Sequence, residues 1–385
     1  MSGRRETDRY DVAVVGLGVM GLAAAAALAR RGARVIGIEQ FAFAHSRGSS
    51  HGQSRIIRRA YPEDPGYQPL LEGAYAGWAA LEEDAGTRLF HRCGFLASGP
   101  EGGDYVTRLA DGYRRSGLPY EVLDPEAVRR RFPLFRIPDH HIAFQDPLGG
   151  ILETDACLRA LRRRAEQSGA RLRFDSPVVA WGADGHGAWV ETASERFTAG
   201  TLVITAGAWA GPLLAAAGLP LRIWRRVLSW HRGANGAMMG PARFPAFVID
   251  LPQGGFYGCP ALDDRGIKVG EHNRPWPVAT PEAIDGTLDP AEAGLLRDMA
   301  GAVFPDLDPV PVATERCLYT VTPDRHFVID RHPGRERVWI GAGFSGHGFK
   351  FAPVIGTILA DLALEGRTRL PIGMFGLGRF GTGLG

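Results

Sequence analysis

Two lysines stand out among the residues that could do chemistry. The chain's 44 basic residues include only two lysines, Lys268 and Lys350, and the rest are arginines. Lysine carries a compact ammonium whose pKa can shift, whereas the planar guanidinium of arginine stays charged. A site that needs a small positive charge close to a reacting atom would therefore keep lysine against this bias. The alternative is that both survived by chance on the surface. However, residues 266–270 are typical of a strand and residues 346–351 open a helix.

A glycine-rich segment near the N-terminus predicts a nucleotide site. The pattern is a buried strand, three glycines, a helix ended by Gly32, a second strand and an acid, which is the order of a β-α-β dinucleotide-binding unit. The members are the strand 10–15, Gly16, Gly18, Gly21, the helix 22–31, the strand 34–38 and Glu39.

Each part of this unit has a chemical reason. Gly16 allows a tight turn, Gly18 lets the backbone approach a pyrophosphate, and Gly21 lets helix and strand pack closely. The helix N-terminus offers free N–H groups to phosphate. Glu39 can accept hydrogen bonds from ribose hydroxyls and would repel a 2′-phosphate, so NAD and FAD both stay open.

Buried strands recur over residues 201–205 and 336–342. We therefore predict an α/β protein: a Rossmann-like FAD-binding domain of the glutathione-reductase type, and an antiparallel-sheet substrate domain. The expected pieces are 9–90, 150–215 and 321–370 for the first, 91–149 and 216–320 for the second, and a loose tail over 371–385. Other expected elements are a polar loop over 46–59, helices over 67–83, 154–169 and 349–364, a strand over 171–179 and a hairpin around 189–198.

Composition excludes several classes of protein. The net charge of +2 is close to balance, which gives no sign of nucleic acid or an anionic membrane as a partner. No apolar run reaches the roughly 20 residues that span a bilayer, and residues 1–10 lack the apolar stretch of a signal peptide. The four cysteines, Cys93, Cys157, Cys259 and Cys317, have neither disulfide-framework nor zinc spacing. A cytoplasmic protein without a bound metal is expected.

Four motifs together resemble the monomeric sarcosine oxidase family of flavoproteins, which includes N-methyltryptophan oxidase. The likeness runs over roughly residues 9–370, and the second and fourth motifs are the specific ones. The motifs are residues 16–21, residues 48–58 (GSSHGQSRIIR), residues 317–320 with 324–330, and residues 343–350 (GFSGHGFK).

The resemblance implies an amine oxidase whose FAD is linked covalently to Cys317. A thiolate can attack the C8 methyl position of an oxidised flavin and leave a thioether, which would fix the ring and tune its electronics. It also implies that Gly343, Gly346, His347, Gly348 and Lys350 lie against the cofactor. The partial positive charge of the last helix would then stabilise negative charge on the reduced ring.

The same resemblance assigns the substrate side. Arg58 and Lys350 would bind the substrate carboxylate, because a guanidinium can hold it bidentately. His272, Tyr257 and Tyr319 would orient the amine and exclude water. Lys268, with Arg55 and His51 nearby, would stabilise the charge that develops when O₂ is reduced. The alternatives are a surface ion pair for Arg58 and aromatic core for the two tyrosines.

We therefore predict the oxidation of a secondary amine that bears a carboxylate, most simply an N-methyl amino acid such as sarcosine. The products would be an imine or formaldehyde and hydrogen peroxide, and the protein would be a monomer. Gln53 and Val248 depart from the pattern of the relatives and leave the substrate's identity open. A cyclic imino acid such as pipecolate or proline is the nearest alternative substrate, and a biosynthetic amine is another. More distant alternatives are an NAD-dependent dehydrogenase, a partner-dependent subunit and a flavin-binding protein without activity.

Overall fold

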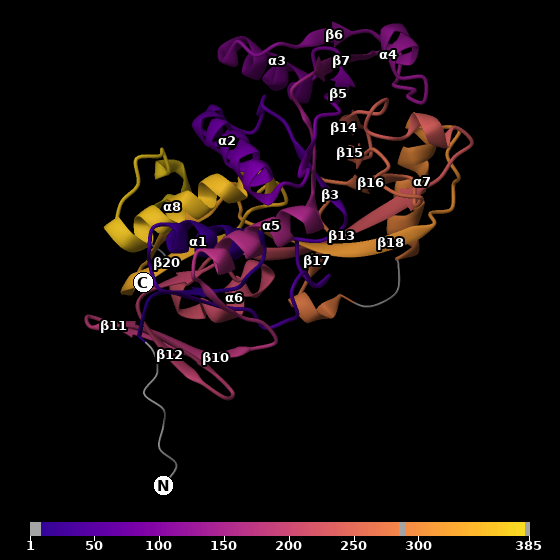
Figure 1. The fold of residues 1–385 in the computed structure, drawn as a ribbon. Coiled ribbons are helices and arrows are strands. Elements are labelled where there is room, and N and C mark those ends of the chain that lie inside the picture. The colour runs from indigo at the N-terminus through magenta and orange to yellow at the C-terminus, as the bar shows by residue number, and fades with distance from the viewer. Residues whose placement is uncertain (1–8, 285–288, 382–385) are drawn as a thin grey trace.

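The computed structural model describes residues 9–284 and 289–381, and it contains two large β-sheets and a small one (Figure 1). The first large sheet has eight strands. They are β1 (Arg9–Val15), β2 (Val35–Ile38), β9 (Arg171–Arg173), β10 (Val178–Asp184), β11 (Gly187–Thr192), β12 (Arg196–Ile204), β19 (Val328–His332) and β20 (Arg335–Ala342).

A parallel group forms the centre of this sheet. β1 lies between β2 and β12, and β20 pairs with the far side of β12. Val15 is in register with both Ile38 and Ile204, so these strands end at the same edge. Ligands of open parallel sheets bind at the carboxyl ends of the strands. The residues that follow these strands are therefore brought together there.

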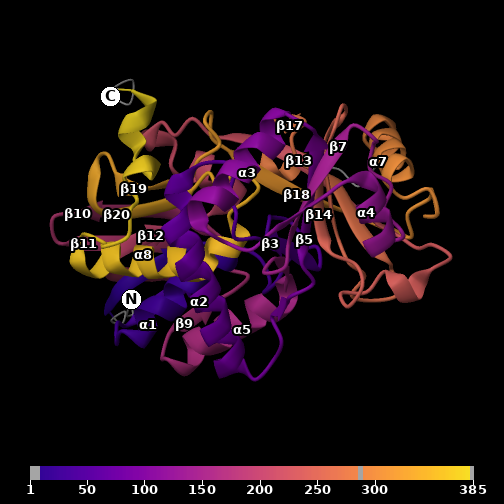
Figure 2. The same cartoon turned by 90° about the horizontal axis from the view of Figure 1, so that it is seen from above.

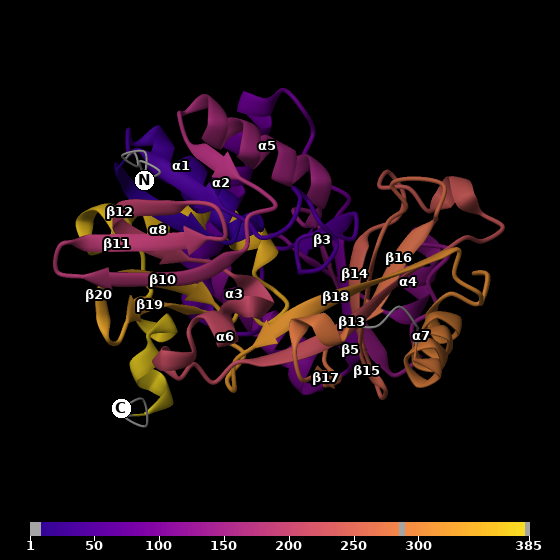
Figure 3. The ribbon, with the colours of Figure 1, turned by 90° about the horizontal axis from the view of Figure 1, so that it is seen from below.

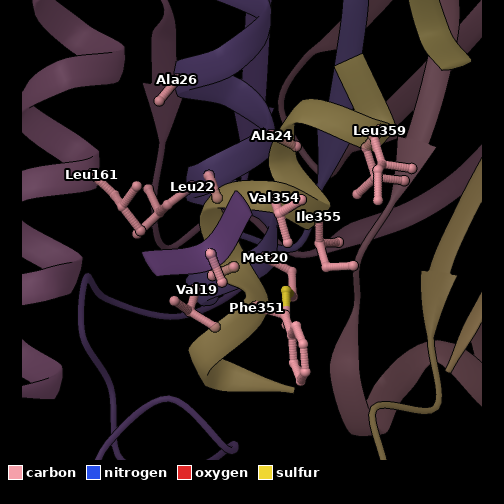
Figure 4. Close-up of a cluster of buried hydrophobic side chains, with 14 of the residues drawn as sticks. Val19, Met20, Leu22, Ala24, Ala26, Leu161, Phe351, Val354, Ile355 and Leu359 are labelled. Carbon is pink, nitrogen blue, oxygen red and sulfur yellow. The ribbon is translucent and has the colours of Figure 1, made fainter. Parts of the chain in front are cut away.

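A layer of helices covers one face of the sheet. It consists of α1 (Val19–Arg30), α2 (Gln68–Ala85), α5 (Thr154–Gln167) and α8 (Ala352–Glu365). Figure 4 shows α1 between α8 and Leu161 of α5, with apolar side chains filling the contacts. The alanine-rich sequence of α1 allows α8 to come close: a Cβ on Gly356 would lie 2.5 Å from the Ala23 carbonyl carbon.

The short helix α6 (Ala210–Leu213) packs on the other face of the sheet, and β10 and β11 extend the sheet beyond β12, as the view from below shows (Figure 3). The predicted hairpin near residue 190 is the β11–β12 pair. The single strand expected over 171–179 was wrong. Its first part, β9, pairs with β2, whereas its second part opens β10 at the opposite edge of the sheet.

The second large sheet has nine strands and is mostly antiparallel. They are β5 (Phe95–Pro100), β6 (Glu121–Leu123), β7 (His141–Asp146), β13 (Arg222–His231), β14 (Ala246–Leu251), β15 (Gly254–Cys259), β16 (Ile267–Glu271), β17 (Pro277–Val278) and β18 (Ala313–Val321). The helices α3 (Asp104–Ser116), α4 (Pro125–Arg131) and α7 (Pro290–Val303) accompany it, and a phenylalanine cluster that includes Phe135, Phe247 and Phe304 fills its core.

The long strands β13 and β18 link the two halves of the molecule, as the view from above shows (Figure 2). The segment expected to be a polar loop over 46–59 contains β3 (Ser54–Ile57), which pairs with β8 (Gly150–Glu153), and β4 (Phe90–His91) completes this small sheet. The described 3₁₀ helices are η1 (Pro65–Tyr67), η2 (Gly207–Trp209), η3 (Ala215–Ala217), η4 (Gly236–Met238), η5 (Pro281–Ala283), η6 (Phe349–Phe351), η7 (Gly373–Phe375) and η8 (Leu377–Phe380).

The predicted α/β class, with one Rossmann-like sheet and one mostly antiparallel sheet, is confirmed. The loose tail over 371–385 was wrong for the part that the structure describes. Phe375 and Leu377 are buried, and the Leu377 N–H donates to Asp330 Oδ2 at 2.7 Å; residues 382–385 lie outside the described residues. None of the described helices is long and apolar enough to cross a membrane.

Candidate active site

A cavity of about 390 Å³ opens at the carboxyl edge of the parallel sheet. One end is lined by the turn after β1 and by Glu39, and the other by the segment after β20, from Gly343 to Phe349. Thr205, which follows β12, lies between them. The shared edge of the sheet thus joins the first and fourth predicted motifs in one cavity.

The glycine turn has the geometry that the sequence pattern requires. Gly16 has a φ of +89°, and its N–H donates to the Ile38 carbonyl at 2.8 Å. A Cβ on Gly21 would lie 1.8 Å from the Gly16 carbonyl oxygen, so no other residue fits there. Gly18 is the N-cap of α1 and supplies no side chain to close the first turn, which leaves this helix end suited to a phosphate.

Glu39 lies at the end of β2 and lines the cavity. Its Oε2 accepts the Leu17 N–H at 2.8 Å and its Oε1 accepts the Phe41 N–H at 3.1 Å. Burial raises the pKa of this carboxyl, and the backbone donors oppose the shift. Each carboxylate oxygen keeps a further lone pair, which a ribose hydroxyl can use.

The far end of the cavity also fits a dinucleotide with a ring system. Gly343 and Gly346 have φ values of +59° and +82°, and Gly346 lies against the Tyr319 ring, where a Cβ would come within 2.2 Å. The Thr320 hydroxyl lines the cavity and is buried with no partner among the described residues. A buried hydroxyl of this kind needs a partner, and a bound cofactor would supply one.

A second cavity of about 450 Å³ meets the first. Both are lined by Arg55, Tyr319, Ser345, Gly346 and Phe349. The second also brings together the predicted substrate residues Arg58, Tyr257, His272, Tyr319 and Lys350. They come from β15, β18, the residues just after β3 and β16, and η6. Cys317 and His347, which were predicted at the cofactor, line the second cavity as well.

Positive charge gathers at one wall of the second cavity. The buried Arg58 donates from Nη2 to Glu63 Oε1 at 2.6 Å, whereas its Nη1 is buried without a partner among the described residues. Lys350 Nζ donates to the His347 carbonyl at 2.8 Å and lies 5.2 Å from the Tyr61 ring. Burial and the neighbouring Arg58 lower the pKa of Lys350 to about 7, against a smaller opposing effect of Glu63.

His272, Tyr319 and Tyr257 form another part of the cavity wall. His272 Nδ1 lies 3.2 Å from the Tyr319 hydroxyl, and burial, with the nearby Arg226, lowers the pKa of His272 well below its usual value. Burial raises the pKa of Tyr319 to about 12. Tyr257 faces His272 edge to face at 6.2 Å between ring centroids. This wall therefore offers polar groups without a net charge.

Cys317 on β18 is buried, lines the second cavity, and is one of four free cysteines in the described chain. Burial raises the pKa of its thiol, while Arg55, Arg226 and Lys268 favour the thiolate. The same sulfur is thus shielded from water and placed among cations.

Lys268 and His51 line neither cavity. Lys268 is 1% exposed, and its ammonium donates to the carbonyls of Gly52 (2.9 Å) and Ser54 behind the cavity wall. Burial lowers its pKa to about 8. His51 Nδ1 lies 3.1 Å from Glu315 Oε2. The guanidinium of Arg55 donates to the carbonyls of Ser54 and Ser49. Arg55 lines both cavities, whereas Lys268 and His51 lie behind their walls.

Glu63 and Arg226 are among the site residues that the sequence reasoning missed. Glu63 pairs with Arg58. The sequence could have indicated this pair, because Glu63 is an acid five residues after Arg58, a predicted ligand of the substrate carboxylate. Arg226 is fully buried on β13, lies 4.7 Å from the Tyr319 ring, and donates to the carbonyl of His272 at 2.9 Å. An arginine among the buried residues of a strand would have been its only signal.

His347, predicted at the cofactor, has both ring nitrogens bound, to Tyr61 Oη and the Arg325 carbonyl.

Comparison with known proteins agrees with this geometry. The family model described as FAD dependent oxidoreductase matches residues 11–362. The chain is 41% identical to monomeric sarcosine oxidase of Streptomyces avermitilis over 373 residues (95% of this chain, 96% of the relative). It is 33% identical to N-methyl-L-tryptophan oxidase of Yersinia pestis over 378 residues (96% and 99%).

Among solved structures, the open form of NikD, described as an unusual amino acid oxidase essential for nikkomycin biosynthesis, superposes with a TM-score of 0.84. The identity is 29%, with 96% of this chain and 98% of that chain covered. The match favours FAD over the nicotinamide alternative, and the residues of the first cavity fit that cofactor. The chain therefore belongs to the FAD-dependent oxidoreductases, in the family of the monomeric sarcosine and N-methyltryptophan oxidases.

Proposed function

We propose that this protein is an amine oxidase that acts on a secondary α-amino acid, most simply an N-methyl amino acid. The observation that carries the proposal is the joined pair of cavities, in which two cations without a full set of partners, Arg58 and Lys350, lie next to the ring end of the dinucleotide cavity. The names of the sarcosine and N-methyltryptophan oxidases among its relatives support the same substrate class.

The substrate carboxylate would bind between Arg58 and Lys350. Arg58 Nη1 is buried and unpartnered among the described residues, so a carboxylate there would relieve a desolvation penalty as well as gain a charge-assisted hydrogen bond. Glu63 holds the other side of the guanidinium and fixes its direction. Lys350 would supply the second positive charge when it is protonated.

The amine would lie toward His272, Tyr319 and Tyr257. His272 is neutral at pH 7, because burial and Arg226 lower its pKa, so it does not repel an ammonium and can accept a hydrogen bond. Bound FAD supplies the two-electron oxidation of the carbon next to the amine nitrogen. The amine must lose a proton to react, so the rate of flavin reduction should rise with pH. A flat profile would count against this mechanism.

We further propose that FAD is attached through the Cys317 sulfur. The thiol lines the cavity beside the shared wall, and three cations favour its thiolate form. Acid precipitation of the purified protein tests the link: a yellow pellet over a clear supernatant supports it, and a yellow supernatant contradicts it.

Lys268 and Arg55 are proposed to serve oxygen reduction. Lys268 lines neither cavity and is held by two carbonyls, so its charge would act on the site from behind Arg55, which lines both cavities. We also propose that the two large sheets mark the cofactor and substrate domains, and that the protein acts as a monomer.

A substrate panel tests the whole proposal. Sarcosine and larger N-methyl amino acids should yield hydrogen peroxide and formaldehyde in equal amounts, because oxidation of the N-methyl carbon gives an N-methylene imine, which hydrolyses to formaldehyde and the primary amino acid. If only pipecolate or proline gives peroxide, with no formaldehyde, the cyclic imino acid alternative is correct. Bound flavin that no amine reduces would leave a flavin-binding protein without this activity.

A further inference from the structure

The second cavity extends beyond the residues that would hold the flavin ring and the amino acid. Its volume of about 450 Å³ includes the space of the ring edge at Cys317 as well as that of the substrate. The residues beyond the carboxylate wall come from the first turn of α3 and from β14, and include Tyr105, Arg108, Val248 and Asp250. These residues lie where a substrate side chain would extend.

Four carboxylates line this cavity, and three of them are already paired by arginines. Glu63 is bound by Arg58, Asp104 by Arg108 at 3.1 Å, and Asp324 by Arg379 at 2.7 Å. The carboxylate of Asp250 alone among the four makes no side-chain hydrogen bond or ion pair to a described residue, although the charge of Arg108 acts on it. It is also only partly exposed, so water does not fully solvate it.

The backbone directs the Asp250 side chain into the cavity. Side chains alternate along a strand, and Val248 and Asp250 of β14 both line the cavity, whereas Ile249 between them is buried in the core. A Cβ placed on Gly99 would lie 3.3 Å from Asp250 Cβ and 3.7 Å from Tyr105 Cδ1. Asp250 and Tyr105 therefore flank the same short stretch of β5.

The Tyr105 hydroxyl adds a second polar group in want of a partner. It is buried and has no hydrogen-bond partner among the described residues. Burial raises the pKa of Tyr105 to about 12; the charge of Arg58 lowers this pKa and the charge of Asp250 raises it. The cavity thus runs from the cations Arg58 and Lys350, past this hydroxyl, to an unpaired carboxylate.

We infer that Asp250 recognises a positively charged group at the end of the substrate side chain. This inference rests on the proposed function and names its substrate class: secondary α-amino acids with a basic side chain, for which Nα-methyl-lysine serves as the probe. The carboxylate end of such a molecule meets Arg58 and Lys350, and its distal ammonium meets Asp250. Arg108, which is paired with Asp104, already places a positive charge near Asp250. This charge weakens the preference of Asp250 for a cationic side chain.

The test uses the holoenzyme and two substrates of matched length. Nα-methyl-lysine and Nα-methyl-norleucine differ at the end of the side chain, ammonium against methyl. Binding is measured by calorimetry without oxygen, and kcat/KM is measured by peroxide release. The wild type should prefer the lysine compound by about tenfold or more, as for other charge-assisted hydrogen bonds.

Asp250→Asn should remove most of this preference and leave the norleucine compound within about twofold. Arg108→Gln should increase the preference for Nα-methyl-lysine over Nα-methyl-norleucine. The matched control is Asp111→Asn, the same substitution on α3 at a carboxylate that pairs with Arg114 and lines no part of the cavity.

Equal binding of the two compounds by the wild type, or equal losses for both in Asp250→Asn, would overturn the inference. Failure of the proposed function is a separate result: neither compound, nor sarcosine, would then reduce the flavin. Because the calorimetric preference does not depend on turnover, it tests Asp250 in either case.

Discussion

Replacing Lys350 by Met should abolish a pH dependence of carboxylate binding. The pKa of Lys350 is lowered to about 7, chiefly by burial and then by Arg58. A bound carboxylate favours the protonated ammonium, so affinity should be fully present below about pH 7 and be lost as the pH rises through that value.

The size of the effect follows from this pKa. If only the protonated form binds well, the dissociation constant rises about tenfold per pH unit above pH 7, or about 100-fold by pH 9. The rise stops when the whole contribution of the ammonium is lost. A hydrogen bond to a charged group contributes about 1.5–3 kcal/mol, or roughly 10- to 150-fold.

Methylthioacetate is a suitable probe, because it carries the carboxylate and has sulfur in place of the amine, so the amine proton plays no part. Its binding would be followed through the flavin spectrum between about pH 6 and 9. Lys350→Met should bind more weakly at pH 6 and show no slope above pH 7. The matched control is Lys268→Met at the chain's other lysine, which lines neither cavity and should keep the slope. A flat wild-type profile, or an unchanged slope in Lys350→Met, would refute the reasoning.

Three further changes test other parts of the site. Gly21→Ala should give protein with little flavin, measured by absorbance after purification, because a Cβ would lie 1.8 Å from the Gly16 carbonyl oxygen; normal flavin content would contradict the role of this turn. Cys317→Ser should move the yellow colour from the acid pellet to the supernatant, and colour that stays in the pellet would exclude this attachment point. Lys268→Met should slow reoxidation of the reduced enzyme by O₂ about 100-fold or more while anaerobic reduction changes little; equal losses in both steps, measured by stopped flow, would contradict a role in oxygen reduction.

The sequence predicts the cofactor end of the molecule well because that end is built from local patterns. Gly16, Gly21 and Glu39 lie within one β-α-β unit, and the turn between them allows few geometries. Cys317 and Lys350 required the family resemblance, since nothing in the spacing of two isolated residues places them at one cavity.

Other features depend on contacts between distant segments. Arg226 lies on β13, and its position under Tyr319 follows from the pairing of β13 with β18. The unpaired state of Asp250 became visible only when the partners of the neighbouring carboxylates were known. The tail was expected to be loose from its glycine content, but Phe375 is fully buried, and this contact outweighs the weak local preference.

The most direct test of the proposed function is anaerobic titration of the holoenzyme with sarcosine, Nα-methyl-lysine and the methyl esters of both. The free acids should bleach the oxidised flavin band, and the esters should do so much more slowly, because Arg58 and Lys350 then have no carboxylate to bind. If no compound bleaches the flavin, or if esters and acids react equally well, the carboxylate-bearing amine is not the substrate.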